Sequence, residues 1–139
     1  MGQIRDIMNK HVVTISKEKT CHEAASLLQE KDISFLVVAE GQNPIGIVTE
    51  ADFVRKIVAE NKIASDLKVS DIMSPKFRWV EPTTTIEDAV QKMLNNKIRR
   101  LIVLEDQKLA GVVTQTDLAM HLRSKILIDE TVRSVGKED

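Results

Sequence analysis

The sequence predicts an α/β protein made of two copies of one β-α-β-β-α unit. When the chain is shifted by 65 residues, Ile4–Phe53 aligns with Val69–Leu118 without a gap, and 14 of the 50 pairs are identical. In each copy an amphipathic segment with helical spacing precedes two short runs of valine, isoleucine and leucine. Hydrophobic residues make up 42% of the 139 residues and charged residues 29%, as in ordinary globular proteins.

Each copy opens with the same three elements. A short helical turn is followed by an extended piece and then by an amphipathic helix. The first two cover Ile4–Met8 and Val12–Ile15 in the first copy, and Val69–Met73 and Phe77–Val80 in the second. Thr20 and Thr85 are the expected N-caps of the two helices, because a threonine side chain satisfies a free backbone amide at a helix start.

Two apolar strands and a further helix complete each unit. We expect the strands at Phe35–Ala39 and Ile45–Thr49, and at Leu101–Leu104 and Leu109–Thr114, with four-residue polar turns between them. Such uninterrupted apolar runs are typical of strands buried on both faces. A helix begins at Glu50 or Gln115, Val54–Lys68 is a mostly helical link, and Arg123–Asp139 is a helical tail that frays at its charged end. The predicted boundaries are therefore 1–62 for the first repeat, 63–124 for the second and 125–139 for the tail.

Charge and cysteine content exclude several classes of protein. Lys and Arg number 20 against 21 Asp and Glu, and this net charge of −1 disfavours general binding to nucleic acid. The single cysteine, Cys21, excludes an intrachain disulfide and a cysteine metal cage. There is no apolar core of signal-peptide length at the start, and no apolar run approaches the roughly 20 residues that span a membrane. We expect a cytoplasmic protein with no membrane role.

The junction between the last strand and the following helix carries the pattern Gly-x-x-Thr-x-x-Asp in both copies. It covers Gly46–Asp52 and Gly111–Asp117, which we call the first and second Thr–Asp signatures. One interpretation is helix capping, in which Thr and Asp satisfy free backbone amides. The other is a nucleotide site, because a helix start attracts anions and a carboxylate one turn inside can accept both hydroxyls of a ribose. Capping does not require the glycine, and the whole set occurs twice.

These residues resemble a tandem pair of CBS domains, also called a Bateman module. The resemblance rests on Asp-Ile-Met at Asp6–Met8 and Asp71–Met73, on the element order and on the duplicated signature, and it covers about residues 3–122. It implies two repeats packed sheet to sheet with pseudo-twofold symmetry. It also implies two clefts that bind AMP, ADP, ATP or S-adenosylmethionine.

The resemblance further implies which residues line each cleft. Cleft A would use Thr114, Thr116 and Asp117 for ribose and phosphate, with Met8, His11, Val13, Ile33, Ser34 and Phe35 near the base. Cleft B would use Thr49 and Asp52 with Met73, Lys76, Arg78, Ile98, Arg99 and Arg100. The clefts differ, since Ala51 stands where the second signature has Thr116. A guanidinium suits phosphate, so Arg99 and Arg100 are the phosphate candidates; alternatively they form a solvated start of a strand, pointing to opposite faces.

Three further residues have structural interpretations. Trp79 is expected in the core rather than on a ligand. Cys21, in the first turn of a helix, is expected to be structural, although a helix start can lower a thiol pKa. His11 alone makes neither a metal site nor a catalytic dyad.

Three classes of function remain open. The first is a regulatory, energy-sensing module that binds adenine nucleotides and has no catalytic domain attached. The second is a module with empty clefts that binds an unidentified protein, and binding of S-adenosylmethionine or nucleic acid are further alternatives. The third is a small enzyme, which we do not expect, because no residue set supplies a nucleophile or a general base.

Apolar residues after each signature indicate a homodimer. They exceed what one small sheet can cover, and contiguous exposed apolar surface usually marks an interface. In the alternative, the tail folds back and covers them. The residues are Phe53, Val54, Ile57, Val58 and Ile63, and Leu118, Met120, Leu122, Ile126, Leu127 and Ile128.

Overall fold

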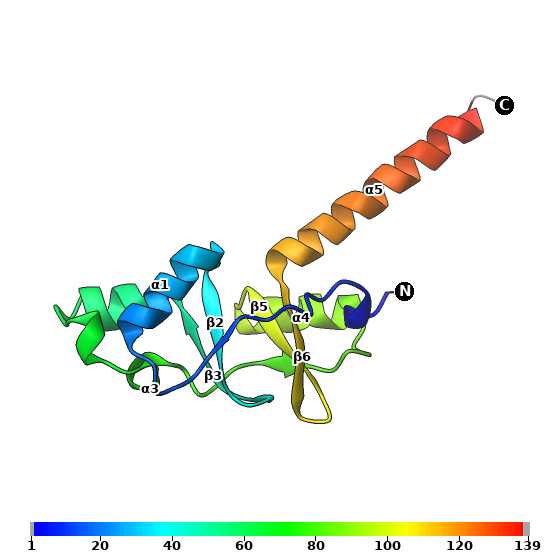
Figure 1. The fold of residues 1–139 in the computed structure, drawn as a ribbon. Coiled ribbons are helices and arrows are strands. Elements are labelled where there is room, and N and C mark those ends of the chain that lie inside the picture. The colour runs from blue at the N-terminus through cyan, green and yellow to red at the C-terminus, as the bar shows by residue number, and fades with distance from the viewer. Residues whose placement is uncertain (1, 138–139) are drawn as a thin grey trace. The chain divides into compact units, whose positions relative to one another are not determined.

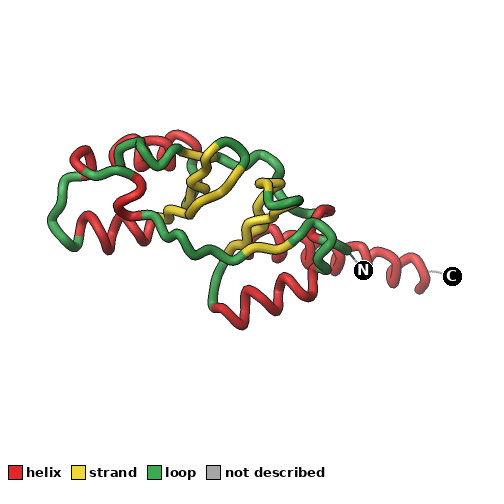
Figure 2. The backbone as a smooth tube through the Cα atoms, turned by 90° about the horizontal axis from the view of Figure 1, so that it is seen from below, coloured by secondary structure: helices red, strands yellow, loops and turns green. Residues whose placement is uncertain are grey.

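A computed structural model describes residues 2–137, with side chains described through residue 127. It contains two three-stranded sheets, with strand orders β1-β2-β3 and β4-β5-β6 (Figures 1 and 2). The chain forms two compact units, and neither unit is one sequence repeat. One consists of residues 11–78 with 105–109, and the other of residues 1–10, 79–104 and 110–139. We call them the first-repeat unit and the second-repeat unit.

The first-repeat unit holds one sheet and the helices of the first copy. Its strands are β1 (Thr14–Ile15), β2 (Phe35–Glu40) and β3 (Asn43–Thr49), and its α-helices are α1 (Cys21–Lys31), α2 (Glu50–Phe53) and α3 (Val69–Ile72). A π-helical turn, η2 (Val54–Val58), continues α2, and a 3-10 turn, η3 (Ala64–Asp66), precedes α3. Strand β1 pairs parallel to β2, with Thr14 opposite Val37, and β2 pairs antiparallel to β3, with Leu36 opposite Val48.

The second-repeat unit has the same order of elements. Its strands are β4 (Trp79–Val80), β5 (Arg100–Glu105) and β6 (Lys108–Thr114), and its helices are the 3-10 turn η1 (Ile4–Asp6), α4 (Ile86–Asn96) and α5 (Gln115–Lys137). Strand β4 pairs parallel to β5. The predicted tail is the continuation of α5, which runs as one helix to Lys137 (Figure 1). The end expected to fray includes residues 138–139, which lie outside the described residues.

The predicted caps and central strands are confirmed. The Thr20 hydroxyl accepts a hydrogen bond from the Glu23 amide at 3.0 Å, and Thr85 accepts one from Asp88 at 3.1 Å. The central strand of each sheet is buried on both faces, since Val37 and Ile102 are buried although neither belongs to the core cluster beneath its sheet. β3 instead alternates between buried and half-buried residues.

Two expectations about these strands are wrong. The turns have two residues rather than four, because β2 and β3 extend to Glu40 and Asn43 and leave only Gly41 and Gln42 between them. In the second sheet Asp106 and Gln107 have φ angles of 51° and 64°, as a tight hairpin turn requires. Trp79 is not a core residue, since it is 43% exposed at the start of its short strand.

Short lead segments, residues 3–9 and 68–74, complete the two units. Ile4 is fully buried in the core of the second-repeat unit, where its amide donates to the Thr84 carbonyl at 2.8 Å. Val69 is fully buried in the core of the first-repeat unit, and its amide donates to the Lys19 carbonyl at 2.8 Å. Each repeat therefore contributes its lead segment to the core of the other repeat.

The glycine of each signature lies against the end of a lead segment. Asn9 and Val112 exchange two backbone hydrogen bonds of 2.8 and 3.0 Å, and Ile47 and Ser74 exchange two of 3.0 and 2.9 Å. A Cβ on Gly111 would lie 2.8 Å from the Asn9 carbonyl oxygen and 3.1 Å from the Met8 sulfur. A Cβ on Gly46 would be crowded in the same way by the Ser74 carbonyl oxygen and the Met73 sulfur. Glycine is thus required by the neighbouring backbone.

We expect Gly111→Ala to lower the free energy of unfolding by about 1–3 kcal/mol, because the methyl group overpacks a contact made by backbone atoms. Chemical denaturation measures the change. Gly41→Asn is the control, since Gly41 has a φ of 62° and no atom within 4 Å of a built Cβ, and asparagine tolerates that backbone conformation. An equal loss in both variants would contradict the packing explanation.

Candidate functional site

The second Thr–Asp signature forms a closed hydrogen-bonded loop at the start of α5. The Thr114 amide donates to Asp117 Oδ2 at 2.8 Å, and the Thr114 hydroxyl donates to the same oxygen at 2.9 Å. The Asp117 amide donates back to the Thr114 hydroxyl at 3.2 Å. The capping interpretation is therefore confirmed here, and capping uses only one of the two carboxylate oxygens.

The first signature repeats this arrangement at the start of α2. The Thr49 amide donates to Asp52 Oδ2 at 2.8 Å, and the Thr49 hydroxyl donates to it at 3.2 Å. In both signatures Oδ2 is bound to the helix start, so Oδ1 is the oxygen left for another partner. A carboxylate held in this way has its orientation set before any ligand arrives.

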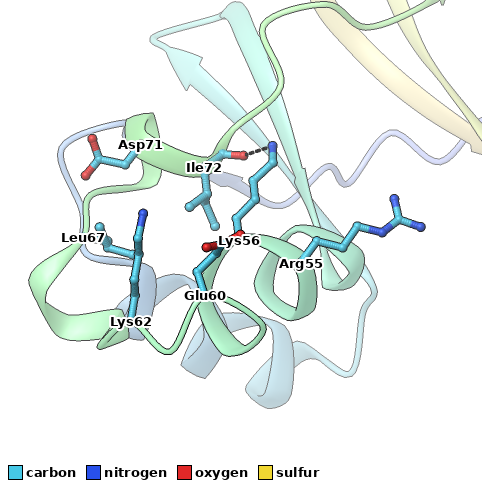
Figure 3. Close-up of a pocket in the computed structure, with 7 residues that line it drawn as sticks. All are labelled: Arg55, Lys56, Glu60, Lys62, Leu67, Asp71 and Ile72. Carbon is cyan, nitrogen blue, oxygen red and sulfur yellow. Dashed lines mark hydrogen bonds between the residues drawn. The ribbon is translucent and has the colours of Figure 1, made fainter.

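The two signatures differ at Oδ1. Lys56, four residues after Asp52, places its ammonium 3.1 Å from Asp52 Oδ1. The same ammonium donates to the Ile72 carbonyl at 2.8 Å (Figure 3). The Asp52 side chain is only 15% exposed, so this ion pair is partly shielded from water. His121 is the residue four positions after Asp117, and within the described part of the chain no ion pair or hydrogen bond occupies Asp117 Oδ1.

Sequence reasoning missed Lys56. The available signal was the spacing Asp-x-x-x-Lys, because side chains four residues apart on a helix lie next to each other. The second copy lacks this spacing, so a comparison of the two copies beyond the signature would have found the difference.

Lys56 also lines a hollow of about 270 Å³ in the first-repeat unit, which the sequence did not predict. Figure 3 shows the Lys56 side chain extending from the helical segment toward the end of α3. The lining combines three cations with two carboxylates and two apolar side chains: Arg55, Lys56, Glu60, Lys62, Leu67, Asp71 and Ile72.

Three of the predicted base-binding and phosphate-binding residues, Ser34, Phe35 and Arg99, lie beside the signature of their own repeat. The Ser34 carbonyl accepts from the Glu50 amide at 3.0 Å, and Phe35 is paired with Thr49 in the sheet. In the second-repeat unit the Arg99 carbonyl accepts from the Gln115 amide at 2.8 Å. Arg99 is exposed and Arg100 is half-buried.

The candidate ligand-binding residues, taken together, are divided between the two units. The second-repeat unit contains Thr114, Thr116, Asp117, Met8, Ile98, Arg99 and Arg100. The first-repeat unit contains Thr49, Asp52, His11, Val13, Ile33, Ser34, Phe35, Met73, Lys76 and Arg78. The structure thus brings Met8 to the strand that ends in Thr114, and Met73 to the strand that ends in Thr49. The grouping of residues from both repeats into clefts A and B stays a prediction.

Cys21 has a structural environment. Its side chain is fully buried, and its thiol donates to the Lys68 carbonyl at 3.3 Å. Burial, with a smaller contribution from the nearby Asp71 carboxylate, raises the pKa of the Cys21 thiol. The helix start therefore does not activate this thiol, which agrees with the structural interpretation.

The described residues form neither a metal-binding cluster nor a membrane-spanning helix. These residues include no group of three or more histidine, cysteine, aspartate or glutamate side chains placed to hold a metal ion. Of the helices that could be assessed there, none has the length and apolar character needed to cross a membrane.

Known proteins are similar in sequence to most of this chain. YhcV of Bacillus subtilis, a CBS domain-containing protein, is 32% identical over 89% of this chain and 88% of its own length. The chain spans 60% and 61% of two longer archaeal relatives, uncharacterised proteins of Methanopyrus kandleri and Methanocaldococcus jannaschii.

Solved structures share the fold. A putative signal-transduction protein with CBS domains from Burkholderia ambifaria is 33% identical, with a TM-score of 0.76 over 81% of this chain and 83% of that one. The CBS domain pair of protein MJ0100, solved in complex with 5′-methylthioadenosine and S-adenosyl-L-methionine, is 24% identical, with a TM-score of 0.80 over 90% of this chain and 98% of that one. The CBS domain family matches residues 4–59 and 69–124, nearly the whole chain, and this protein therefore belongs to the CBS domain family as a tandem pair.

Proposed function

We propose that this protein is a regulatory module that binds an adenosine compound, of the AMP, ADP, ATP or S-adenosylmethionine type, and performs no catalysis. One observation carries the proposal: Asp117 is fixed at a helix start by its Oδ2, while its Oδ1 has no partner among the described side chains. A preoriented carboxylate oxygen of this kind suits a ribose hydroxyl. The adenosine ligands of the MJ0100 pair indicate which compounds to test first.

The remaining candidates have supporting roles in this proposal. Thr116 offers a hydroxyl one residue before Asp117, and the Thr114 hydroxyl, which already donates to Asp117, can take part only as an acceptor. The helix start of α5 favours a negatively charged group. The Arg99 carbonyl accepts from the Gln115 amide at that helix start, so its backbone lies next to the position at which a phosphate would be bound in this proposal. We propose the cytoplasm as its compartment, where a single free cysteine is ordinary.

A second candidate function, interaction with a partner protein, is favoured by exposed apolar side chains after both signatures. Val58 is 72% exposed and Met120 is 66% exposed, and Val54, Ile63, Leu122, Ile126 and Leu127 are also exposed. Ile57 and Leu118, expected in the same surface, are instead buried in the cores, and Phe53 is half-buried. The side chain of Ile128 lies outside those described. A second copy of the chain is the partner that we propose for these exposed side chains.

We expect Asp117→Ala to weaken the binding of AMP by about 1.5–3 kcal/mol, because a hydrogen bond to a charged acceptor is lost. Isothermal titration calorimetry measures the affinity. Loss of the cap should also lower the free energy of unfolding by about 0.5–2 kcal/mol, so a thermal melt must show that the variant is folded. Unchanged affinity in the folded variant would remove Asp117 from the site.

The phosphate assignment predicts a difference between two ligands. Replacing both Arg99 and Arg100 by alanine should weaken AMP binding at least tenfold and leave adenosine binding nearly unchanged, because only AMP carries the phosphate that a guanidinium binds. The control variant, Arg123→Ala with Lys125→Ala, removes the same charge from exposed positions of α5. Equal losses for adenosine and AMP would show that the arginines act through folding.

The exposed apolar residues predict a homodimer. Light scattering at micromolar concentration should give a mass near twice 15.6 kDa. Because α5 is one continuous helix to Lys137, the tail does not turn back to cover the exposed apolar residues of the same helix. Met120→Glu with Ile126→Glu should shift the mass toward the monomer, since two charges then enter a desolvated interface. A wild-type mass of one chain would reject the dimer.

A further inference from the structure

We propose that Lys56 makes the two Thr–Asp signatures unequal, so that a nucleoside binds first at Asp117 and only weakly at Asp52. Lys56 would then be a selectivity residue of the first signature. The inference rests on the proposed function, since it concerns the same ligand class, and it adds which signature is used and why.

The two oxygens of each signature carboxylate have different partners. In both signatures Oδ2 accepts two hydrogen bonds from the threonine of the same signature. A ribose hydroxyl must therefore use Oδ1 as its main acceptor. The two copies are alike up to this point, so the difference between them comes from what else contacts Oδ1.

At Asp52 that oxygen already has a cation. The Lys56 ammonium is 3.1 Å away, and it is also held by the Ile72 carbonyl at 2.8 Å. A ribose hydroxyl would have to displace the ammonium or share the oxygen with it. Displacement is costly here because a charge-assisted contact on the Asp52 side chain, which is only 15% exposed, is lost, and because the ammonium has a second bond that holds it in place (Figure 3).

At Asp117 the corresponding position on the helix is His121. Its side chain is half-buried, and no ion pair or hydrogen bond to Asp117 is found for it in the described part of the second-repeat unit. The oxygen of Asp117 is thus available to a ligand hydroxyl. A second difference acts in the same direction, because Thr116 adds a hydroxyl where the first signature has Ala51.

The experiment measures adenosine binding by isothermal titration calorimetry, with one signature disabled at a time. Adenosine is the probe because it is neutral, so removing a lysine does not weaken attraction to a phosphate. Asp117→Ala isolates the first signature, and Lys56→Met in that background should raise its affinity for adenosine about tenfold. Asp52→Ala isolates the second signature, and His121→Lys there should lower its affinity about tenfold.

Two controls separate this effect from a change in folding or net charge. Lys62→Met removes a cation that lines the same hollow, and it should leave the affinity of the first signature unchanged. Lys56→Arg keeps the positive charge beside Asp52 and should behave as the parent. Thermal melts establish that each variant is folded.

The outcomes distinguish this inference from the function on which it rests. An unchanged affinity after Lys56→Met, or the same gain after Lys62→Met, overturns the role of Lys56 while adenosine still binds at Asp117. Failure of the Asp52→Ala protein to bind adenosine overturns the proposed function and this inference with it. Equal affinities of the two isolated signatures before any change at Lys56 overturn the inequality itself.

Discussion

The contact between each signature glycine and a lead segment is the constraint on which the rest of the structure depends. The strand that ends in Thr114 must run against the backbone of Asn9, and the strand that ends in Thr49 must run against Ser74. A side chain at either glycine would separate these segments. Because Ile4 and Val69 lie just upstream in the lead segments and fill the two cores, loss of the contact would disturb packing as well as backbone pairing.

This contact explains why two repeats occur in one chain. A repeat without its partner would lack a lead segment in its core, and it would leave the backbone groups of β3 or β6 without two hydrogen bonds. The exchange also fixes each strand two residues before its end, at Ile47 and at Val112. The threonine that follows is therefore held at the helix start, where it can close the hydrogen-bonded loop with its aspartate.

Capping and binding do not exclude each other at the signatures. Each carboxylate has two oxygens, and the cap occupies one. The same cap that stabilises the helix also fixes the direction of the second oxygen, so a ligand does not have to order that side chain. Besides Ala51 and Thr116, the copies differ at the side chain one helical turn after the aspartate, which is Lys56 in one and His121 in the other.

The sequence by itself determined the duplication, the order of elements, the helix caps and the family, because these depend on local spacing and on similarity between the copies. Only the tertiary structure decided that the lead segments are exchanged, that Trp79 is exposed and that Asp52 is paired with Lys56. It also decided that the two signature glycines lie against neighbouring backbone. The physical reason is that these features depend on segments such as residues 46–47 and 73–74, which are distant in the chain and meet only when the core is packed.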